Sequence, residues 1–144
     1  MSEKTAYQRL RKNIMRRGDR LTRIENLVGS GIPDTNGCFE GVEFWLEIKC
    51  PREPKRPSTP LFGSNHKLTT EQENFLIDQH KAGGLGWVYI ETDKGLVLLI
   101  SGEHAERINT MTLGDLLAAS AFHFNTKGAD ENAWTLLRGA IRGR

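Results

Sequence analysis

The spacing of apolar residues predicts that the chain begins with helices. Tyr7, Leu10 and Ile14 recur at helical intervals over residues 4–16, which leaves the polar side chains between them to face outward. A glycine-aspartate pair then interrupts the pattern. A second helical piece is expected over residues 20–28, and the run Gly29-Ser30-Gly31 that follows is expected to end it.

An alternating pattern follows and predicts a β-hairpin. Residues 32–35 can begin the first strand, and the pairs Asn36-Gly37 and Glu40-Gly41 have the composition of turns. Over residues 42–49, apolar side chains alternate with a second set that would share the opposite face of a strand. That second set is Glu43, Trp45, Glu47 and Lys49.

The next part of the chain is predicted to be irregular and then helical. Residues 50–66 hold four prolines, a density that opposes both helices and central strands. Thr69 or Thr70 can cap a helix that runs to about residue 82, and Gln72 or Glu73 then occupies the capping-box position.

Two further strands and two helices complete the predicted order. The strands are expected over residues 87–91 and 96–100, joined by a tight turn. The helices are expected over residues 113–121 and 131–141. Helices that alternate with hairpins indicate an α/β domain with a mixed sheet.

Composition adds that the chain is an ordinary globular domain. Its 144 residues suit one core, with 38% hydrophobic and 26% charged residues. No apolar run approaches the roughly 18 residues of a membrane span, and no apolar leader opens the chain. Two cysteines are too few for a disulfide framework. We therefore expect a cytoplasmic protein with reduced thiols and no membrane partner.

Charge is distributed unevenly along the chain. Residues 1–24 hold eight Lys or Arg and two acids, so they carry +6, whereas the whole chain carries +2. A basic arm on a slightly acidic body is typical of proteins that bind polyanions. A solvated helix face would explain the same charges equally well.

Three side chains in the predicted hairpin have the chemistry of phosphodiester hydrolysis. Glu47 and Lys49 leave the same face of a strand, and Asp34 would meet Glu47 if the two strands pair. Carboxylates bind Mg²⁺, which neutralises a phosphate and lowers the pKa of an attacking water. The Ile48 carbonyl between them can add a metal ligand, and Glu25 can add a third carboxylate.

The run Gly31-Ile32-Pro33-Asp34, followed thirteen residues after Asp34 by Glu47-Ile48-Lys49, resembles the PD-(D/E)XK signature. The resemblance is to small phage and archaeal nucleases of the Holliday-junction-resolvase-like or VRR type, and it covers about residues 20–100. It implies a restriction-endonuclease-like core, in which helices flank a mixed β-sheet, with extra C-terminal helices. Such a protein is possible in a phage, acting in the cytoplasm of its host.

The resemblance also implies roles for individual residues. Glu25, Asp34 and Glu47 would bind Mg²⁺ or Mn²⁺, Lys49 would assist the attacking water, and Gln72 would occupy a recurring site position. Gln72 as a plain capping-box residue and Glu25 as an exposed helix charge stay open as alternatives. Only eight residues separate Glu25 from Asp34, so the strand that usually lies between them must be missing or very short.

We therefore expect one nuclease domain over residues 1–144, with a basic helical arm (1–24), a catalytic core (25–100) and a C-terminal helical extension (103–144). The expected activity is metal-dependent endonucleolytic cleavage of DNA, with branched DNA such as a Holliday junction preferred and a homodimer implied. Flaps, nicks or linear duplexes are alternative substrates, and a non-catalytic DNA-binding or assembly protein on a decayed nuclease fold is the alternative function. The residues expected to contact DNA phosphates are Arg9, Lys12, Arg16, Arg20, Arg23, Arg52, Lys55 and Arg56.

Overall fold

The computed structural model describes residues 2–24, 31–63 and 65–143, and its centre is a six-stranded mixed sheet. The strands lie in chain order, and β3 and β4 form the one parallel pair among them. The strands are β1 (Arg20–Arg23), β2 (Thr35–Phe39), β3 (Val42–Lys49), β4 (Leu85–Glu91), β5 (Leu96–Ser101) and β6 (Phe122–Asn125). The predicted α/β class with a mixed sheet is confirmed.

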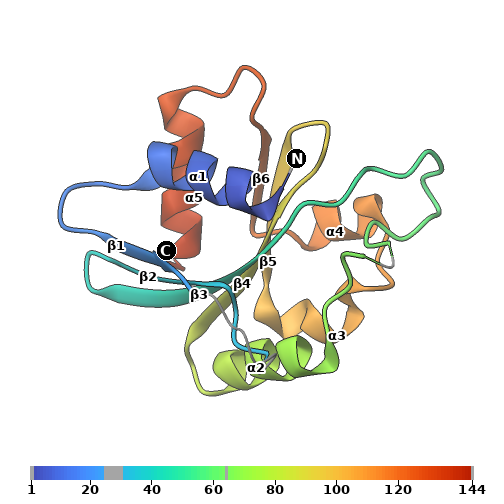
Figure 1. The fold of residues 1–144 in the computed structure, drawn as a ribbon, viewed down its shortest axis with the longest axis horizontal. Helices are drawn as coiled ribbons and strands as arrows, with labels where there is room; N and C mark the ends of the chain where they lie inside the picture. Colours follow the sequence, from blue (N-terminus) through green and yellow to red (C-terminus); the bar gives the residue numbers. More distant parts are fainter. Residues whose placement is uncertain (1, 25–30, 64, 144) are drawn as a thin grey trace.

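Helices cover both faces of this sheet (Figure 1). One face packs against α1 (Glu3–Ile14) and α5 (Glu131–Ile141). The other face packs against α2 and three short helical segments. These elements are α2 (Thr70–Lys81), η1 (Gly102–His104), α3 (Ala105–Ile108) and α4 (Leu113–Ala119). The crossover through α2 explains why β3 and β4 are parallel, since two parallel strands need a long connection.

The helix expected at the start of the chain is confirmed as α1. Ser2 caps it by accepting a hydrogen bond from the Thr5 N–H, and Ala6, Leu10 and Ile14 form its buried stripe.

Within the described ranges, no helix is both long and apolar enough to cross a membrane.

The helical piece expected over residues 20–28 is wrong where it can be compared. Residues 20–23 form β1, an edge strand paired antiparallel with β2. Leu21 is the one fully buried residue of this strand, so a single apolar contact and the ladder of backbone hydrogen bonds decide its conformation. The remainder of the expected helix, Glu25 included, lies outside the described residues.

The hairpin of β2 and β3 has one turn where the sequence suggested two. Glu40 and Gly41 both have positive φ (50° and 82°), as the tight hairpin turn requires. Asn36-Gly37 is not a turn but lies inside β2. A Cβ on Gly37 would lie 2.3 Å from Cζ of Phe44, its partner across the ladder, so the glycine makes room for that ring.

The second half of the chain confirms most expected elements and adds others. The strands expected over 87–91 and 96–100 are β4 and β5, and the last two predicted helices are α4 and α5. Residues 50–66 hold no helix and no strand among those described. The sequence interpretation missed η1, α3 and β6. Because β6 pairs with β5, residues 103–144 extend the sheet as well as adding helices.

Candidate metal centre

The site forms where β2 begins and β3 ends, at one end of these two inner strands. Asp34 directly precedes β2, and the antiparallel register pairs Thr35 with Leu46, next to Glu47. The Asp34 carboxylate accepts hydrogen bonds from the Ile48 N–H (3.2 Å to Oδ2) and from the Thr35 hydroxyl (3.0 Å). The backbone of the neighbouring strand therefore fixes the orientation of Asp34 beside Glu47.

A third carboxylate reaches the same place from the first turn of α1. Oxygens of Glu3, Asp34 and Glu47 all lie within 4.8 Å of one another. The sequence interpretation missed Glu3 and named Glu25, which lies outside the described residues. The available signal was that Glu3 is the one acid before Asp19 in a basic segment, placed just after a serine that can cap a helix.

Burial makes the charged forms of the Asp34 and Glu47 carboxylates unfavourable. Burial and the nearby Asp34 charge raise the pKa of Glu47 to about 8, although Lys49 opposes this rise. Burial likewise raises the pKa of Asp34 to about 6, against the stabilising hydrogen bond from Ile48. A divalent cation between these oxygens would relieve the repulsion. The all-carboxylate donor set fits a hard cation such as Mg²⁺ or Mn²⁺.

Lys49 and Gln72 lie at the same centre. The Lys49 Nζ is 3.8 Å from Oε2 of Glu47, and its side chain is almost covered. Gln72 accepts a hydrogen bond from the Thr69 N–H, which makes it a capping-box residue of α2. It also lines the cavity of about 310 Å³ that holds Asp34, Glu47 and Lys49, so its place in the capping box is compatible with the predicted site role, which stays a prediction.

Ile48 contributes its backbone N–H to Asp34, and metal binding by its carbonyl stays a prediction. Trp45, on the same strand face as Glu47, packs edge-on against Phe75 of α2 with ring centroids 5.3 Å apart. Its role is therefore to hold the helix against the strand that carries Glu47.

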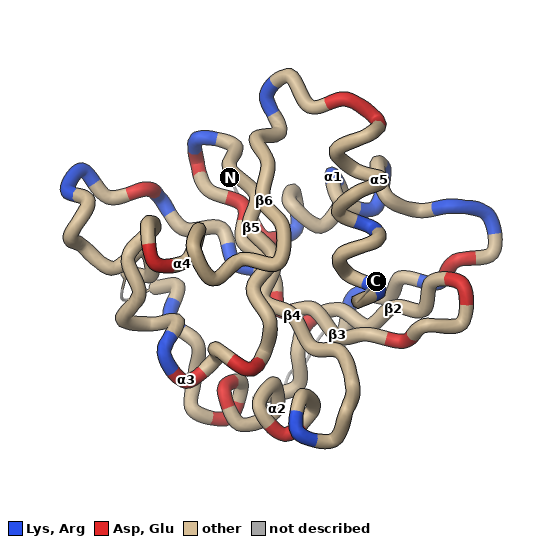
Figure 2. The backbone as a smooth tube through the Cα atoms, turned by 180° about the vertical axis from the view of Figure 1, so that it is seen from behind, with Lys and Arg blue, Asp and Glu red and all other residues tan. Residues whose placement is uncertain are grey.

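The basic residues expected at DNA belong to several elements, and Figure 2 shows Lys and Arg residues distributed over the whole backbone. Arg23 lines the cavity, and its guanidinium lies 5.7 Å from the Tyr7 ring centroid. Arg9 forms an ion pair with the buried Glu91 and lies on the side of α1 away from the metal centre. The remaining six are exposed to solvent: Lys12, Arg16, Arg20, Arg52, Lys55 and Arg56.

Comparisons with known proteins support the fold at the level of structure. No protein-family model and no curated protein matches the chain. A solved structure of Hjc, a Holliday junction resolvase from the archaeal hyperthermophile Archaeoglobus fulgidus, does match, with a TM-score of 0.51. The match covers 82% of this chain and 89% of that one at 14% sequence identity. The chain therefore has the restriction-endonuclease-like α/β fold of that structure.

Proposed function

We propose that this chain, which has the fold of an archaeal Holliday junction resolvase, is a metal-dependent endonuclease that hydrolyses phosphodiester bonds in DNA. The observation that carries the proposal is the convergence of three carboxylates, from Glu3, Asp34 and Glu47, next to Lys49. Three buried or half-buried acids with one amine match the needs of phosphodiester cleavage better than those of fold stability, because their mutual repulsion is destabilising without a cation.

In this proposal Glu3, Asp34 and Glu47 hold Mg²⁺ or Mn²⁺, and the Ile48 carbonyl can complete the set. Bound metal supplies charge neutralisation of the scissile phosphate and a lowered pKa for the attacking water. The Ile48 N–H and the Thr35 hydroxyl keep the Asp34 oxygens aimed at the centre. Held in place, these ligands need no reorganisation when the substrate arrives.

Lys49 has a separate proposed role on the substrate side. Its ammonium group is tethered near Glu47 and lines the same cavity. From there it donates hydrogen bonds to the attacking water and stabilises negative charge as it builds on the phosphate. Gln72, at the cavity wall, is proposed to position the same water or phosphate with its amide group.

DNA is the proposed partner, gripped through its phosphates. Arg23 contributes positive charge inside the cavity, and the exposed basic residues of α1, β1 and the segment after β3 extend it. Contacts of this kind bind DNA without reading its sequence, and they weaken as salt rises. Branched DNA as the substrate rests on the likeness to the archaeal Holliday junction resolvase alone. A homodimer as the active species follows from that substrate, because two symmetric cuts need two sites.

A panel of synthetic DNAs tests the substrate. Wild-type protein is incubated with a four-way junction, a flap, a nicked duplex and a linear duplex, each with Mg²⁺, Mn²⁺ or EDTA. We expect metal-dependent cleavage that is fastest on the junction. Equal rates on all four would remove the branched-DNA part of the proposal. Tight binding with no cleavage of any DNA would favour the decayed-nuclease alternative.

A further inference from the structure

A groove of about 660 Å³ lies beside α1, on the side away from the metal centre. One wall is the polar face of α1, with Thr5, Gln8 and Lys12 among its residues. The other walls are the turn between β4 and β5 (residues 92–95) and the turn that follows β6 (residues 126–129). In Figure 1 these two turns project on the same side of the sheet as α1.

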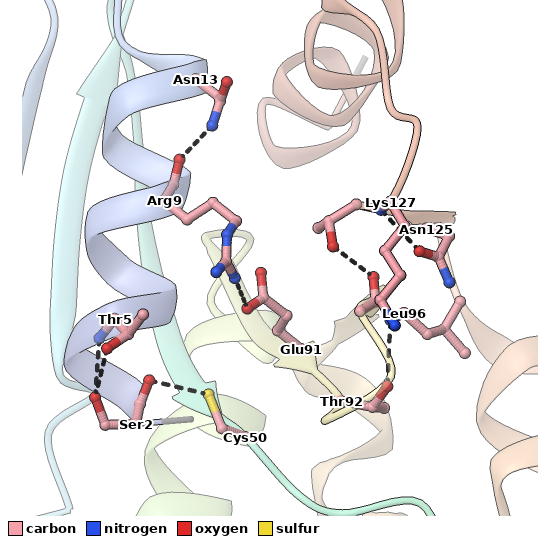
Figure 3. Close-up of polar contacts among 12 residues, drawn as sticks. Ser2, Thr5, Arg9, Asn13, Cys50, Glu91, Thr92, Leu96, Asn125 and Lys127 are labelled. Atoms are coloured by element: carbon pink, nitrogen blue, oxygen red, sulfur yellow. Dashed lines mark hydrogen bonds and ion pairs between the residues drawn. The ribbon is translucent and has the colours of Figure 1, made fainter.

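Hydrogen bonds fix the two turns to each other, so the groove has a built wall. The Thr126 N–H donates to the Gly95 carbonyl at 2.8 Å, and the Thr126 hydroxyl contacts the same oxygen at 3.1 Å. The Lys127 N–H donates to the Asn125 side chain at 2.8 Å. Figure 3 shows the contact between Lys127 and Asn125 across from the Arg9 side chain of α1. The backbone that carries Lys127 is thus held in place at the edge of the groove.

Arg9 ties α1 to the sheet within this groove. Its guanidinium forms an ion pair with Glu91, a fully buried residue at the end of β4 (Figure 3). The buried carboxylate offsets the Arg9 charge and holds the side chain toward the sheet. The net charge of the groove must therefore come from other residues.

Two lysines on opposite walls supply that charge. Lys12 and Lys127 both line the groove, and neither has an ion-pair partner among the described residues. The one acidic lining residue, Asp93, accepts the Glu53 N–H at 2.8 Å and keeps its negative charge, which the two lysines together exceed. Most other lining residues are neutral and polar. This combination of two opposed ammonium groups and polar walls suits an anion.

The groove and the metal centre lie at the same end of the sheet, where β3, β4 and β6 end and β5 begins. Lys49 ends β3, Glu91 ends β4, and Asn125 at the end of β6 pairs with Leu96 at the start of β5. Three interstrand spacings separate β3 from β6, about 14 Å in all. Along a DNA strand that distance corresponds to about four nucleotides. One DNA molecule can therefore reach both places.

We propose that this groove binds the phosphodiester backbone of the DNA substrate within about four nucleotides of the scissile phosphate, with Lys12 and Lys127 as its phosphate contacts. The inference rests on the proposed nuclease function and adds a second binding place to it. Trp134, the aromatic residue of the lining, is only 6% exposed, so no ring is available for base stacking. The groove therefore contacts phosphates and does not read bases.

Binding in EDTA tests the groove separately from cleavage. The affinity for a fluorescent four-way junction is measured over a range of salt for wild type, Lys12→Ala, Lys127→Ala and Lys81→Ala. Lys81 is the matched control because it is an exposed lysine at the end of α2, outside both cavities. At 0.1 M salt, loss of Lys12 or Lys127 is expected to weaken binding about tenfold and to reduce the salt slope by about one.

Equal affinities and equal salt slopes for Lys127→Ala and Lys81→Ala would contradict DNA binding in the groove, whatever the result of the cleavage assays. Absence of metal-dependent cleavage, by contrast, overturns the nuclease proposal and leaves this binding result to be judged by itself. A second measurement locates the contact. Single phosphates of the junction are replaced by neutral methylphosphonates, and a position within about four nucleotides of the cut should weaken binding of wild type but not of Lys127→Ala. Equal sensitivity of both proteins at every position contradicts the proposal.

Discussion

Among single residues, Glu47 lies in surroundings that oppose its own charge. It is 4% exposed, it contacts a second carboxylate, and its pKa rises to about 8. Asp34, with its pKa raised to about 6, shares this stress. Buried acids of this kind are costly for folding and are concentrated at functional sites. The metal-free protein should therefore reveal them through the pH dependence of its stability.

The metal-free protein is expected to lose stability as pH rises from about 4 to 8. Both folded pKa values lie above the ordinary values of 3.8 and 4.5, so the native state binds more protons than the unfolded state in this window. Each proton lost on the way up therefore destabilises the native state, by a few kcal/mol in total. Thermal unfolding in EDTA at pH 5 and pH 8 measures the effect.

Two controls belong to that experiment. Mn²⁺ at pH 8 should raise Tm, because the cation binds the native carboxylates and not the unfolded chain. Glu47→Gln should flatten the pH dependence and remove most of the Tm gain from Mn²⁺. A metal-free protein whose Tm is the same at pH 5 and pH 8 would contradict the raised pKa values of Asp34 and Glu47.

Glu3 is expected to be a metal ligand, although it lies in the segment that the charge pattern assigned to DNA. Glu3→Gln keeps the shape of the side chain and removes one charge from the cluster. We expect Mn²⁺ affinity, measured by calorimetry, to fall at least about tenfold. Glu131→Gln is the matched control, since Glu131 is an exposed acid in the first turn of α5. Equal Mn²⁺ affinities for the two variants would exclude Glu3 from the centre.

Between elements, one buried ion pair joins α5 to the turn that follows α1. The Arg138 guanidinium donates to Oδ1 of Asp19 at 3.0 Å and to the Ile14 carbonyl at 3.2 Å, and it lies over the Phe39 ring. The Arg138 contact holds the pKa of Asp19 below its usual value. This pair attaches the C-terminal helix to the helix that carries Glu3.

Arg138→Ala is expected to destabilise the protein by about 3 kcal/mol, because it leaves the Asp19 carboxylate covered and without its cation. Urea unfolding measures the change. Arg142→Ala is the control, since Arg142 pairs with the exposed Glu40 and should cost less than about 1 kcal/mol. A similar small cost for both variants would show that the Asp19–Arg138 pair does not anchor α5.

The elements that the sequence predicted correctly are those whose own apolar pattern decides their structure. α1, β3 and the capped helix α2 are examples, and β4 and β5 follow their apolar runs. The incorrect predictions concern segments whose conformation depends on a partner. β1 depends on pairing with β2, and Gly37 on the ring of Phe44 across the ladder. β6 has an alternating half-buried pattern of four residues, which is too short to indicate a strand by itself.

In the whole molecule, the proposed functional residues lie at one end of the sheet, where β3, β4 and β6 end. The spacing of Asp34, Glu47 and Lys49 along the sequence was enough to predict their meeting, because one hairpin carries all three. Glu3 was not predictable in this way, since its contact with Glu47 joins residues 44 positions apart through the packing of α1. Nor did any local pattern place Lys127 opposite Lys12. Sites built within one supersecondary unit are visible in a sequence, and sites built between units need the fold.

Cleavage of a four-way junction by purified wild type, Asp34→Asn and Lys49→Ala, with Mg²⁺ or Mn²⁺ and in EDTA, tests the central claim most directly. We expect metal-dependent nicks by the wild type and rates at least about 100-fold lower for both variants. We also expect both variants to bind the junction, because most of the proposed phosphate contacts lie on other residues. Metal-dependent cleavage that persists in Asp34→Asn at the wild-type rate would contradict the assignment of this carboxylate centre as the active site.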